Sequence, residues 1–162
     1  MAESVSKGED ENMVNRERLA ETFKFLVQID SVSREEGAMA GEIRKILDFM
    51  GAETFVDSAG DKTGGNTGNL MGRFRGNVQA TPPLLNAHMD TVEPGKGITA
   101  SLENGTFTSD GTTILGADDK SAIAILLETL TILKENALSY GPIELVLTVC
   151  EEIGLLGAKH LD

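Results

Sequence analysis

The sequence predicts an α/β domain in which helices pack against a sheet. Segments with helical spacing of apolar residues alternate with short, β-rich apolar runs, and an Asn-Gly pair marks a hairpin. The chain has 162 residues, of which 40% are apolar and 25% are charged. It is therefore long enough to bury one core, and its composition is that of a globular rather than a disordered chain.

Helices are predicted where apolar residues recur three or four positions apart. The first stripe consists of Leu19, Phe23, Leu26 and Val27, and Asn15 can cap this helix. After a polar loop at residues 30–36, a second stripe runs from Met39 to Met50 and stops at Gly51. Residues 120–134 are apolar on nearly every side, which indicates a buried helix. A further helix is expected from about Gly154.

Strands are predicted from alternating or continuous β-rich runs. These runs cover residues 54–56, 69–75, 82–87 and 142–150. We expect the third to be a central strand and the fourth to be an interior one, and we expect residues 59–68 to form a glycine-rich loop. Asn104-Gly105 predicts a hairpin turn, because both turn positions need a positive φ.

Composition excludes several classes of partner. The chain carries 26 acidic and 14 basic residues, a formal charge of −12, which argues against nucleic acid and against an anionic membrane surface. No apolar run approaches the roughly 20 residues of a membrane span. Cys150 is the single cysteine, so no internal disulfide can form, and we expect a cytoplasmic protein. Residues 1–12 read as a flexible acidic leader before a domain at 13–162.

A histidine and an aspartate follow the third predicted strand. Because alternate side chains of a strand point the same way, His88 and Asp90 share a face at its carboxyl end, where open α/β sheets build their sites. Imidazole is a common zinc ligand, and a nearby carboxylate can fix its tautomer. By themselves, the two residues fit a structural hydrogen-bond network equally well.

Two pairs of neighbouring acids lie at other element ends. Asp118 and Asp119 precede the buried helix, where they either cap it or, beside glycines and apolar residues, hold a cation. Glu151 and Glu152 follow the last strand. They are either solvated charges or a pair in which one binds a metal and the other takes a proton from water. Histidine, aspartate and glutamate together are the ligand types expected of catalytic zinc.

These segments resemble those of a known family. NAHMDTVEPG, SDGTTILGADDKS and TVCEEIGLLGAKHLD are similar to the co-catalytic zinc exopeptidases that include peptidase T, carboxypeptidase G and the aminoacylases. The likeness is greatest to the peptidase T-like (tripeptide aminopeptidase) branch, and it runs from about Val14 to the last residue. It implies a three-layer catalytic domain, here truncated, with a central mixed sheet flanked by helices.

The resemblance also implies a role for each candidate residue. The ligands of two zinc ions would be His88, Asp118 and Glu152. Asp118 would bridge both ions, and its bond to Asp119 is a cis peptide in this family. Asp90 would orient His88, and Glu151 would be the general base that activates water for hydrolysis of a short peptide. Cobalt or manganese could use the same ligands, since availability often decides.

The sequence departs from the family pattern in length. The family needs two more ligands, an acidic residue and a late histidine, and a lid-like second domain that often forms homodimers; all of these lie beyond Asp162. His160 is expected at the surface and not at a ligand position. We therefore expect the chain alone to bind zinc weakly, to turn over slowly or not at all, and to expose apolar surface.

Three functions stay open on this basis. The first is a zinc-dependent exopeptidase that hydrolyses short peptides. The second is an amidohydrolase of the same fold that deacylates N-acyl amino acids, because the same ligands serve both reactions. The third is a non-catalytic, truncated metal-binding fragment, because each zinc would have only two protein ligands here where about three are usual.

Overall fold

The computed structural model describes residues 13–161, so the predicted leader at 1–12 lies outside the described residues. The helices are α1 (Arg16–Val27), α2 (Gly37–Phe49), α3 (Ala59–Thr63), α4 (Ala117–Glu135) and α5 (Leu156–Lys159). The strands are β1 (Glu53–Val56), β2 (Leu70–Phe74), β3 (Leu84–His88), β4 (Ala100–Glu103), β5 (Thr106–Ser109) and β6 (Ile143–Thr148). None of the described helices is long and apolar enough to cross a membrane.

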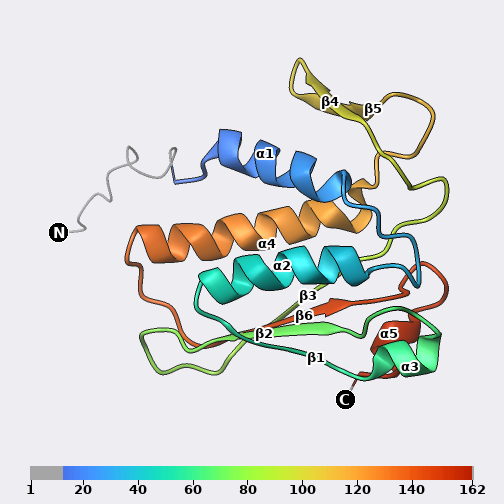
Figure 1. The fold of residues 1–162 in the computed structure, drawn as a ribbon. Helices are drawn as coiled ribbons and strands as arrows, with labels where there is room; N and C mark the ends of the chain where they lie inside the picture. The colour runs from blue at the N-terminus through green and yellow to red at the C-terminus, as the bar shows by residue number, and fades with distance from the viewer. Residues whose placement is uncertain (1–12, 162) are drawn as a thin grey trace.

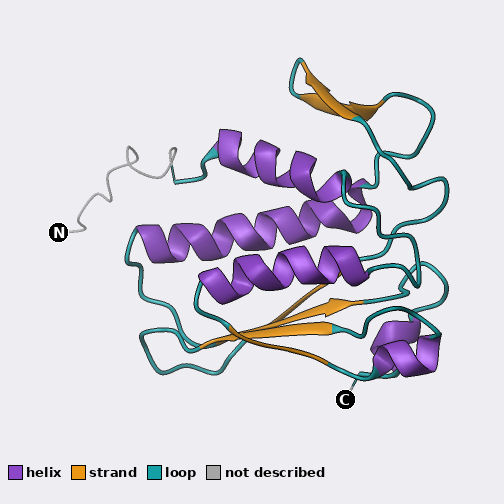
Figure 2. Cartoon of the chain, viewed as in Figure 1, coloured by secondary structure: helices purple, strands orange, loops and turns teal. Residues whose placement is uncertain are grey.

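The main sheet is mixed and has the strand order β1-β2-β6-β3 (Figures 1 and 2). β2 is antiparallel to both β1 and β6, whereas β3 is parallel to β6. β4 and β5 form a separate hairpin. The predicted α/β class with a mixed sheet and helices packed against it is confirmed, and β6 is the interior strand expected.

β3 lies at an edge of the described sheet, so the prediction of a central strand was wrong. Among the described residues only β6 pairs with it. Its apolar character has another source, because α4 packs against β3 and Ala87 is buried there. A run of apolar residues reports burial and does not distinguish cover by a helix from cover by a second strand.

The helices cover one face of the sheet. Figure 1 shows α2 and α4 over the sheet, with α1 beyond α4, while α3 and α5 lie together at one end. A Cβ on Gly72 of β2 would lie 3.3 Å from Leu47 of α2, so alternate β2 residues face this helix. Leu70 and Phe74 share that direction and are buried in the core.

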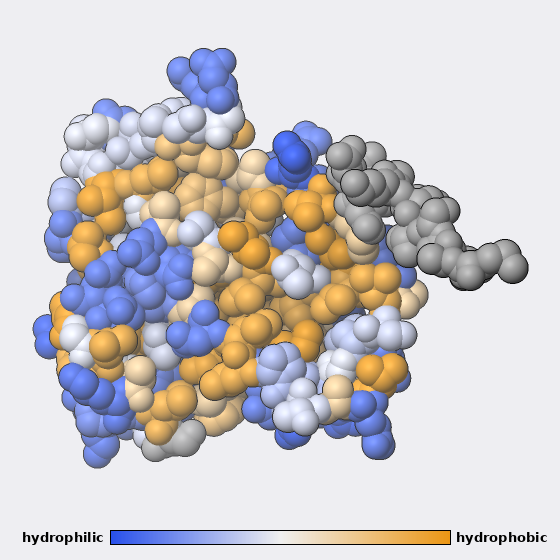
Figure 3. Space-filling view, turned by 180° about the vertical axis from the view of Figure 1, so that it is seen from behind, coloured by the Kyte–Doolittle hydropathy of each residue, from blue (hydrophilic) through white to orange (hydrophobic). Residues whose placement is uncertain are grey.

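The opposite face of the sheet is partly open. Phe55 and Leu84 point to this side, because they pair in register with positions that alternate with Gly72, and they are 53% and 60% exposed. Ile125 on α4 is also exposed. Figure 3 shows apolar side chains gathered across the middle of the molecule's rear face. The expectation of exposed apolar surface is therefore confirmed.

The predicted helix cap and hairpin turn are confirmed, whereas the predicted glycine-rich loop is only partly correct. Asn15 caps α1 by accepting a hydrogen bond from Arg18 N, and Asn104 and Gly105 both have positive φ in the hairpin turn, as predicted. The predicted loop at 59–68 was partly wrong, because its first five residues form α3. A Cβ on Gly60 would lie 2.5 Å from the Thr67 carbonyl oxygen. This glycine therefore serves a close backbone approach.

Candidate metal and catalytic site

The parallel pairing of β3 with β6 sets the position of the site. His88 is in register with Thr148, so the carboxyl ends of both strands meet at one edge. The chain continues from β3 to Asp90 and from β6 to Glu151 and Glu152. The start of α4 lies at the same edge, because Asp118 Oδ1 in its first turn is 3.1 Å from His88 Nε2. Two strand ends and one helix start thus bring the three predicted segments together.

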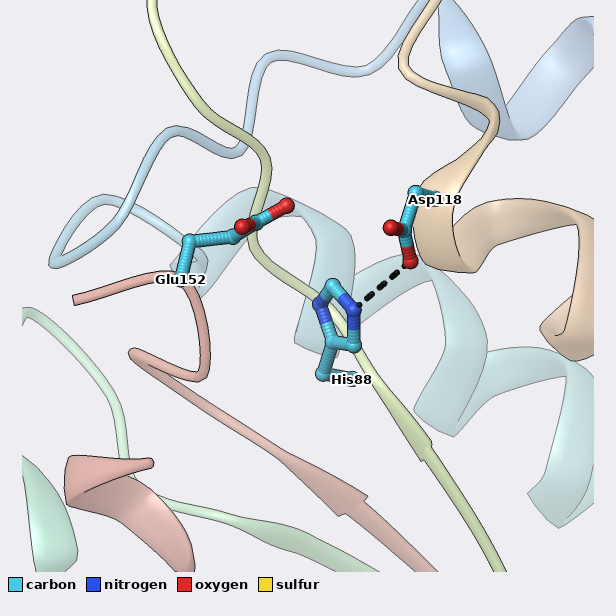
Figure 4. A group of neighbouring side chains, drawn as sticks. All are labelled: His88, Asp118 and Glu152. Atoms are coloured by element: carbon cyan, nitrogen blue, oxygen red, sulfur yellow. Dashed lines mark hydrogen bonds and ion pairs between the residues drawn. The ribbon is translucent and has the colours of Figure 1, made fainter. Parts of the chain in front are cut away.

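Three potential ligand atoms converge at this edge. One atom each of His88, Asp118 and Glu152 lies within 4.8 Å of the other two. Figure 4 shows the Asp118 carboxylate and the His88 ring facing each other, with His88 Nε2 and Asp118 Oδ1 separated by 3.1 Å. His88 is buried, Glu152 is half-buried and Asp118 is exposed, so the cluster has a protected base and an open side.

Asp90 lies next to this cluster and binds the backbone that carries part of it. Its side chain is fully buried, and its oxygens accept hydrogen bonds from Glu151 N at 2.8 Å, Glu152 N at 3.1 Å and Ser33 Oγ at 2.6 Å. Burial acts to raise the pKa of Asp90, but hydrogen bonds from His88, Ser33 and the two amides outweigh it and lower the pKa. Asp90 is therefore an anion that fixes the backbone of the Glu-Glu segment.

The orientation of His88 follows from the same aspartate. Its Nδ1 lies 3.0 Å from the Asp90 carbonyl oxygen and 3.5 Å from Asp90 Oδ1, which leaves Nε2 directed at Asp118. Burial acts to lower the pKa of His88, but hydrogen bonds to Asp90 and Asp118 raise it to about 9. The ring thus lies between two carboxylates, and Nε2 is the atom presented to the open side.

Asp118 and Asp119 face different neighbours. Asp119 lies in the first turn of α4, and its carboxylate accepts a hydrogen bond of 3.4 Å from the backbone N–H of His88. Helix α4 has no side-chain capping hydrogen bond at its N-cap, so the capping interpretation is not supported. The side chain of Asp118 is 84% exposed and turns to His88. Asp118 is therefore solvated, contrary to the expectation that apolar surroundings make its charge costly. The bond between the two aspartates is cis, as the resemblance implies.

The site carries an excess of negative charge. Within residues 13–161, no lysine or arginine forms an ion pair with Asp118, Glu151 or Glu152. Burial raises the pKa of Glu152, and the carboxylates of Asp118, Glu151 and Asp90 add to this although His88 opposes it. Closely spaced carboxylates disfavour one another's ionised forms, and a bound cation relieves that repulsion.

Two residues that hold the candidate site in place lie in a segment that the sequence predicted only as a polar loop. Ser33 donates to Asp90, and Glu36 accepts from the backbone N–H of Cys150 at 2.9 Å. Both contacts join positions far apart in the chain, so no local pattern could reveal them. Cys150 itself is a buried free thiol. His160 is exposed, as predicted.

A mixed α/β domain with a histidine and carboxylates at its strand ends has the architecture of a peptidase catalytic domain. The chain belongs to peptidase family M28, whose family model matches residues 69–162. That match contains all five residues singled out as ligands or catalytic groups.

Relatives of known sequence or structure agree with this assignment. An uncharacterised Bacillus subtilis protein, YqjE, is 43% identical over 150 residues, covering 93% of this chain and 40% of that protein. A Staphylococcus aureus tripeptidase structure is 37% identical with a TM-score of 0.89, and a Bacillus cereus aminopeptidase PepT structure is 42% identical with the same score. Each match covers 93% of this chain but only 40% of the solved chain. The predicted resemblance to peptidase T-like enzymes is confirmed.

Proposed function

We propose that this chain is part of a zinc-dependent exopeptidase that hydrolyses short peptides in the manner of a tripeptide aminopeptidase. The observation that supports this most is the approach of ligand atoms from His88, Asp118 and Glu152 to within 4.8 Å. The similarity to a solved tripeptidase and a solved aminopeptidase supports the substrate class. Residues 13–162 would form the first part of the catalytic domain of a protein with the length of these relatives.

The donor atoms suit the proposed metal. One imidazole nitrogen and two carboxylate oxygens match the ligand types of catalytic zinc, which uses three protein ligands and keeps one position open. A centre with two ions would share Asp118 and would require further donors. We therefore propose that this chain alone holds metal weakly.

The roles of the residues follow from their positions. When bound, divalent metal ions would polarise the scissile carbonyl and make water more acidic. Glu151 Oε2 lies 3.8 Å from His88 Nε2, beside the ligand cluster but outside it. Glu151 would take a proton from water as the water oxygen bonds to the carbonyl carbon. It would then pass that proton to the leaving amine nitrogen as the C–N bond breaks, while Asp90 keeps Glu151 and His88 in place.

An assay of the protein expressed from its complete reading frame tests this function. Tripeptides should be hydrolysed faster than N-acyl amino acids, and Glu151→Gln should lower kcat by about 10²–10⁴-fold. The same variant should leave metal affinity nearly unchanged, because Glu151 is outside the ligand set. Preferential hydrolysis of N-acyl amino acids would contradict the peptidase proposal and favour the amidohydrolase alternative.

We further propose a cytoplasmic location, because Cys150 is the one cysteine of the chain and is a buried free thiol. A homodimer formed through a lid domain stays a prediction.

A further inference from the structure

Glu36 is a buried carboxyl group that the proposed mechanism does not use. It lies at the start of α2, where an acidic side chain would ordinarily be exposed and interact with the free N–H groups of the helix. Here it makes no capping hydrogen bond, and its side chain is fully buried. Burial raises the pKa of Glu36. Burying a carboxyl group is unfavourable, so its contacts must supply whatever offsets this.

Those contacts lead to the turn that follows β6. Glu36 Oε1 accepts a hydrogen bond of 2.9 Å from Cys150 N and lies 3.5 Å from Cys150 Sγ. Cys150 has a φ of 54°, a region that side-chain-bearing residues rarely adopt. Its conformation therefore needs support from the surroundings, and the described residue that binds its N–H is Glu36.

The next two amides are held in the same way. Glu151 N and Glu152 N both donate to Asp90, so two buried carboxyl groups bind three consecutive N–H groups. Asp90 approaches from the end of β3, and Glu36 approaches from α2. The segment that carries both glutamates is thus fixed from two separate elements.

Among the described residues, the hydrogen bonds that join the Glu36 side chain to another part of the fold run to Cys150. The other Glu36 oxygen, Oε2, is buried without a hydrogen-bond partner in that part of the chain. An apolar side chain of similar size would avoid this unsatisfied atom. The bond to Cys150 is therefore the contact that distinguishes a glutamate from an apolar residue at this position.

We propose that Glu36 is a positioning residue that, through the amide of Cys150, holds the turn after β6 so that Glu151 and Glu152 face His88. This inference rests on the proposed function, because it assigns Glu152 as a metal ligand and Glu151 as the base. Glu36 would act on both without touching either side chain.

Cobalt binding by the full chain tests this role, with the visible absorption of Co²⁺ as the readout. Glu36→Met keeps the volume but removes both oxygens, and it should weaken Co²⁺ affinity about 10–100-fold, the range typical of groups that support metal ligands. Glu36→Gln keeps an oxygen that can accept from Cys150 N, and it should restore most of the affinity. Glu35→Met is the matched control, because the neighbouring Glu35 is exposed and pairs with Lys96.

Either of two results would overturn the role of Glu36. One is Co²⁺ affinity in Glu36→Met equal to that of Glu35→Met. The other is an equal loss in the Met and Gln variants, because the amide oxygen preserves the proposed contact.

Amide hydrogen exchange measured by NMR separates this inference from the proposed function. If the unaltered chain binds no Co²⁺, the proposed assignment of His88, Asp118 and Glu152 as metal ligands in this chain fails, and exchange then decides the role of Glu36. The Cys150 amide should be protected in the unaltered chain and should exchange at least about tenfold faster in Glu36→Met, since its acceptor is lost. An unprotected Cys150 amide in the unaltered chain would overturn the inference even if the Met variant fails to fold.

Discussion

Asp90 Oδ1 accepts a hydrogen bond of 2.8 Å from the backbone N–H of Glu151, and this contact joins the ends of β3 and β6. The same carboxylate lies beside the ring of His88. One buried anion therefore sets the position of the candidate base and the orientation of a candidate ligand. The relative positions of His88 and Glu151 therefore depend on a contact between residues that are far apart in the sequence.

Replacing Asp90 by asparagine should destabilise the protein. The amide has one acceptor oxygen where the carboxylate has two, and its NH₂ group would face donors of Ser33 or the Glu-Glu backbone. We expect the free energy of unfolding in urea to fall by about 1–3 kcal/mol. Ser33→Ala removes one donor and should cost less, about 0.5–1.5 kcal/mol. An Asp90→Asn variant as stable as the original chain would contradict the assigned contacts.

A buried carboxylate outside the candidate site, Glu128, predicts a pH dependence of stability. Glu128 on α4 is 5% exposed, and Arg18 of α1 binds it through Nε at 2.6 Å and Nη2 at 2.9 Å. The Arg18 hydrogen bond lowers the pKa of Glu128 below its ordinary value of 4.5, although burial opposes this. Because the folded pKa is the lower one, the stabilisation is complete above 4.5 and is lost as the pH falls through the folded value.

Glu128→Gln should therefore lower the free energy of unfolding by about 1–3 kcal/mol near neutral pH. The difference from the unaltered chain should shrink as the pH falls below the ordinary pKa of glutamate. Urea unfolding across a series of acidic buffers measures this difference. A gap between the two proteins that does not change with pH would show that the ion pair contributes nothing.

Gly157 in α5 should tolerate no side chain. A Cβ there would lie 2.2 Å from the Val149 carbonyl oxygen and 2.6 Å from Asn69 Oδ1. Asn69 is fully buried and accepts from Val149 N, so neither neighbour can move freely. Gly157→Ala should lower the free energy of unfolding by about 1–3 kcal/mol.

Gly41 provides the control for this substitution. It lies inside α2, and no atom of the described chain lies within 4 Å of a Cβ built there. Gly41→Ala should raise stability by about 0.5–1 kcal/mol, because alanine is favoured over glycine within a helix. Equal effects of the two substitutions on thermal or urea unfolding would refute the packing described around Gly157.

Short-range patterns in the sequence predicted most of the fold. Helix α1 and the hairpin were predicted from apolar spacing, the Asn15 cap and the Asn104-Gly105 turn, all of which depend on neighbours within a few residues. The edge position of β3 was not predictable in this way. Strand order depends on which distant segments pair, and an apolar run carries no information about that.

The residues of the candidate site were also predictable only where their position depends on local sequence patterns. Strand-end rules placed His88, Asp90 and the Glu-Glu pair at one edge, because the pattern of an α/β sheet determines where strands end. The sequence did not reveal that Ser33 and Glu36 reach this edge. It also gave the wrong burial for Asp118, because exposure depends on how the loop before α4 turns.

Metal titration of the full chain tests the central claim most directly. Isothermal titration with Zn²⁺ should give weak, saturable binding that becomes at least about tenfold weaker in His88→Ala, Asp118→Asn and Glu152→Gln. His160→Ala should bind as the unaltered chain does, because this second histidine is exposed and outside the cluster. Binding that is the same in His88→Ala and His160→Ala would contradict the account.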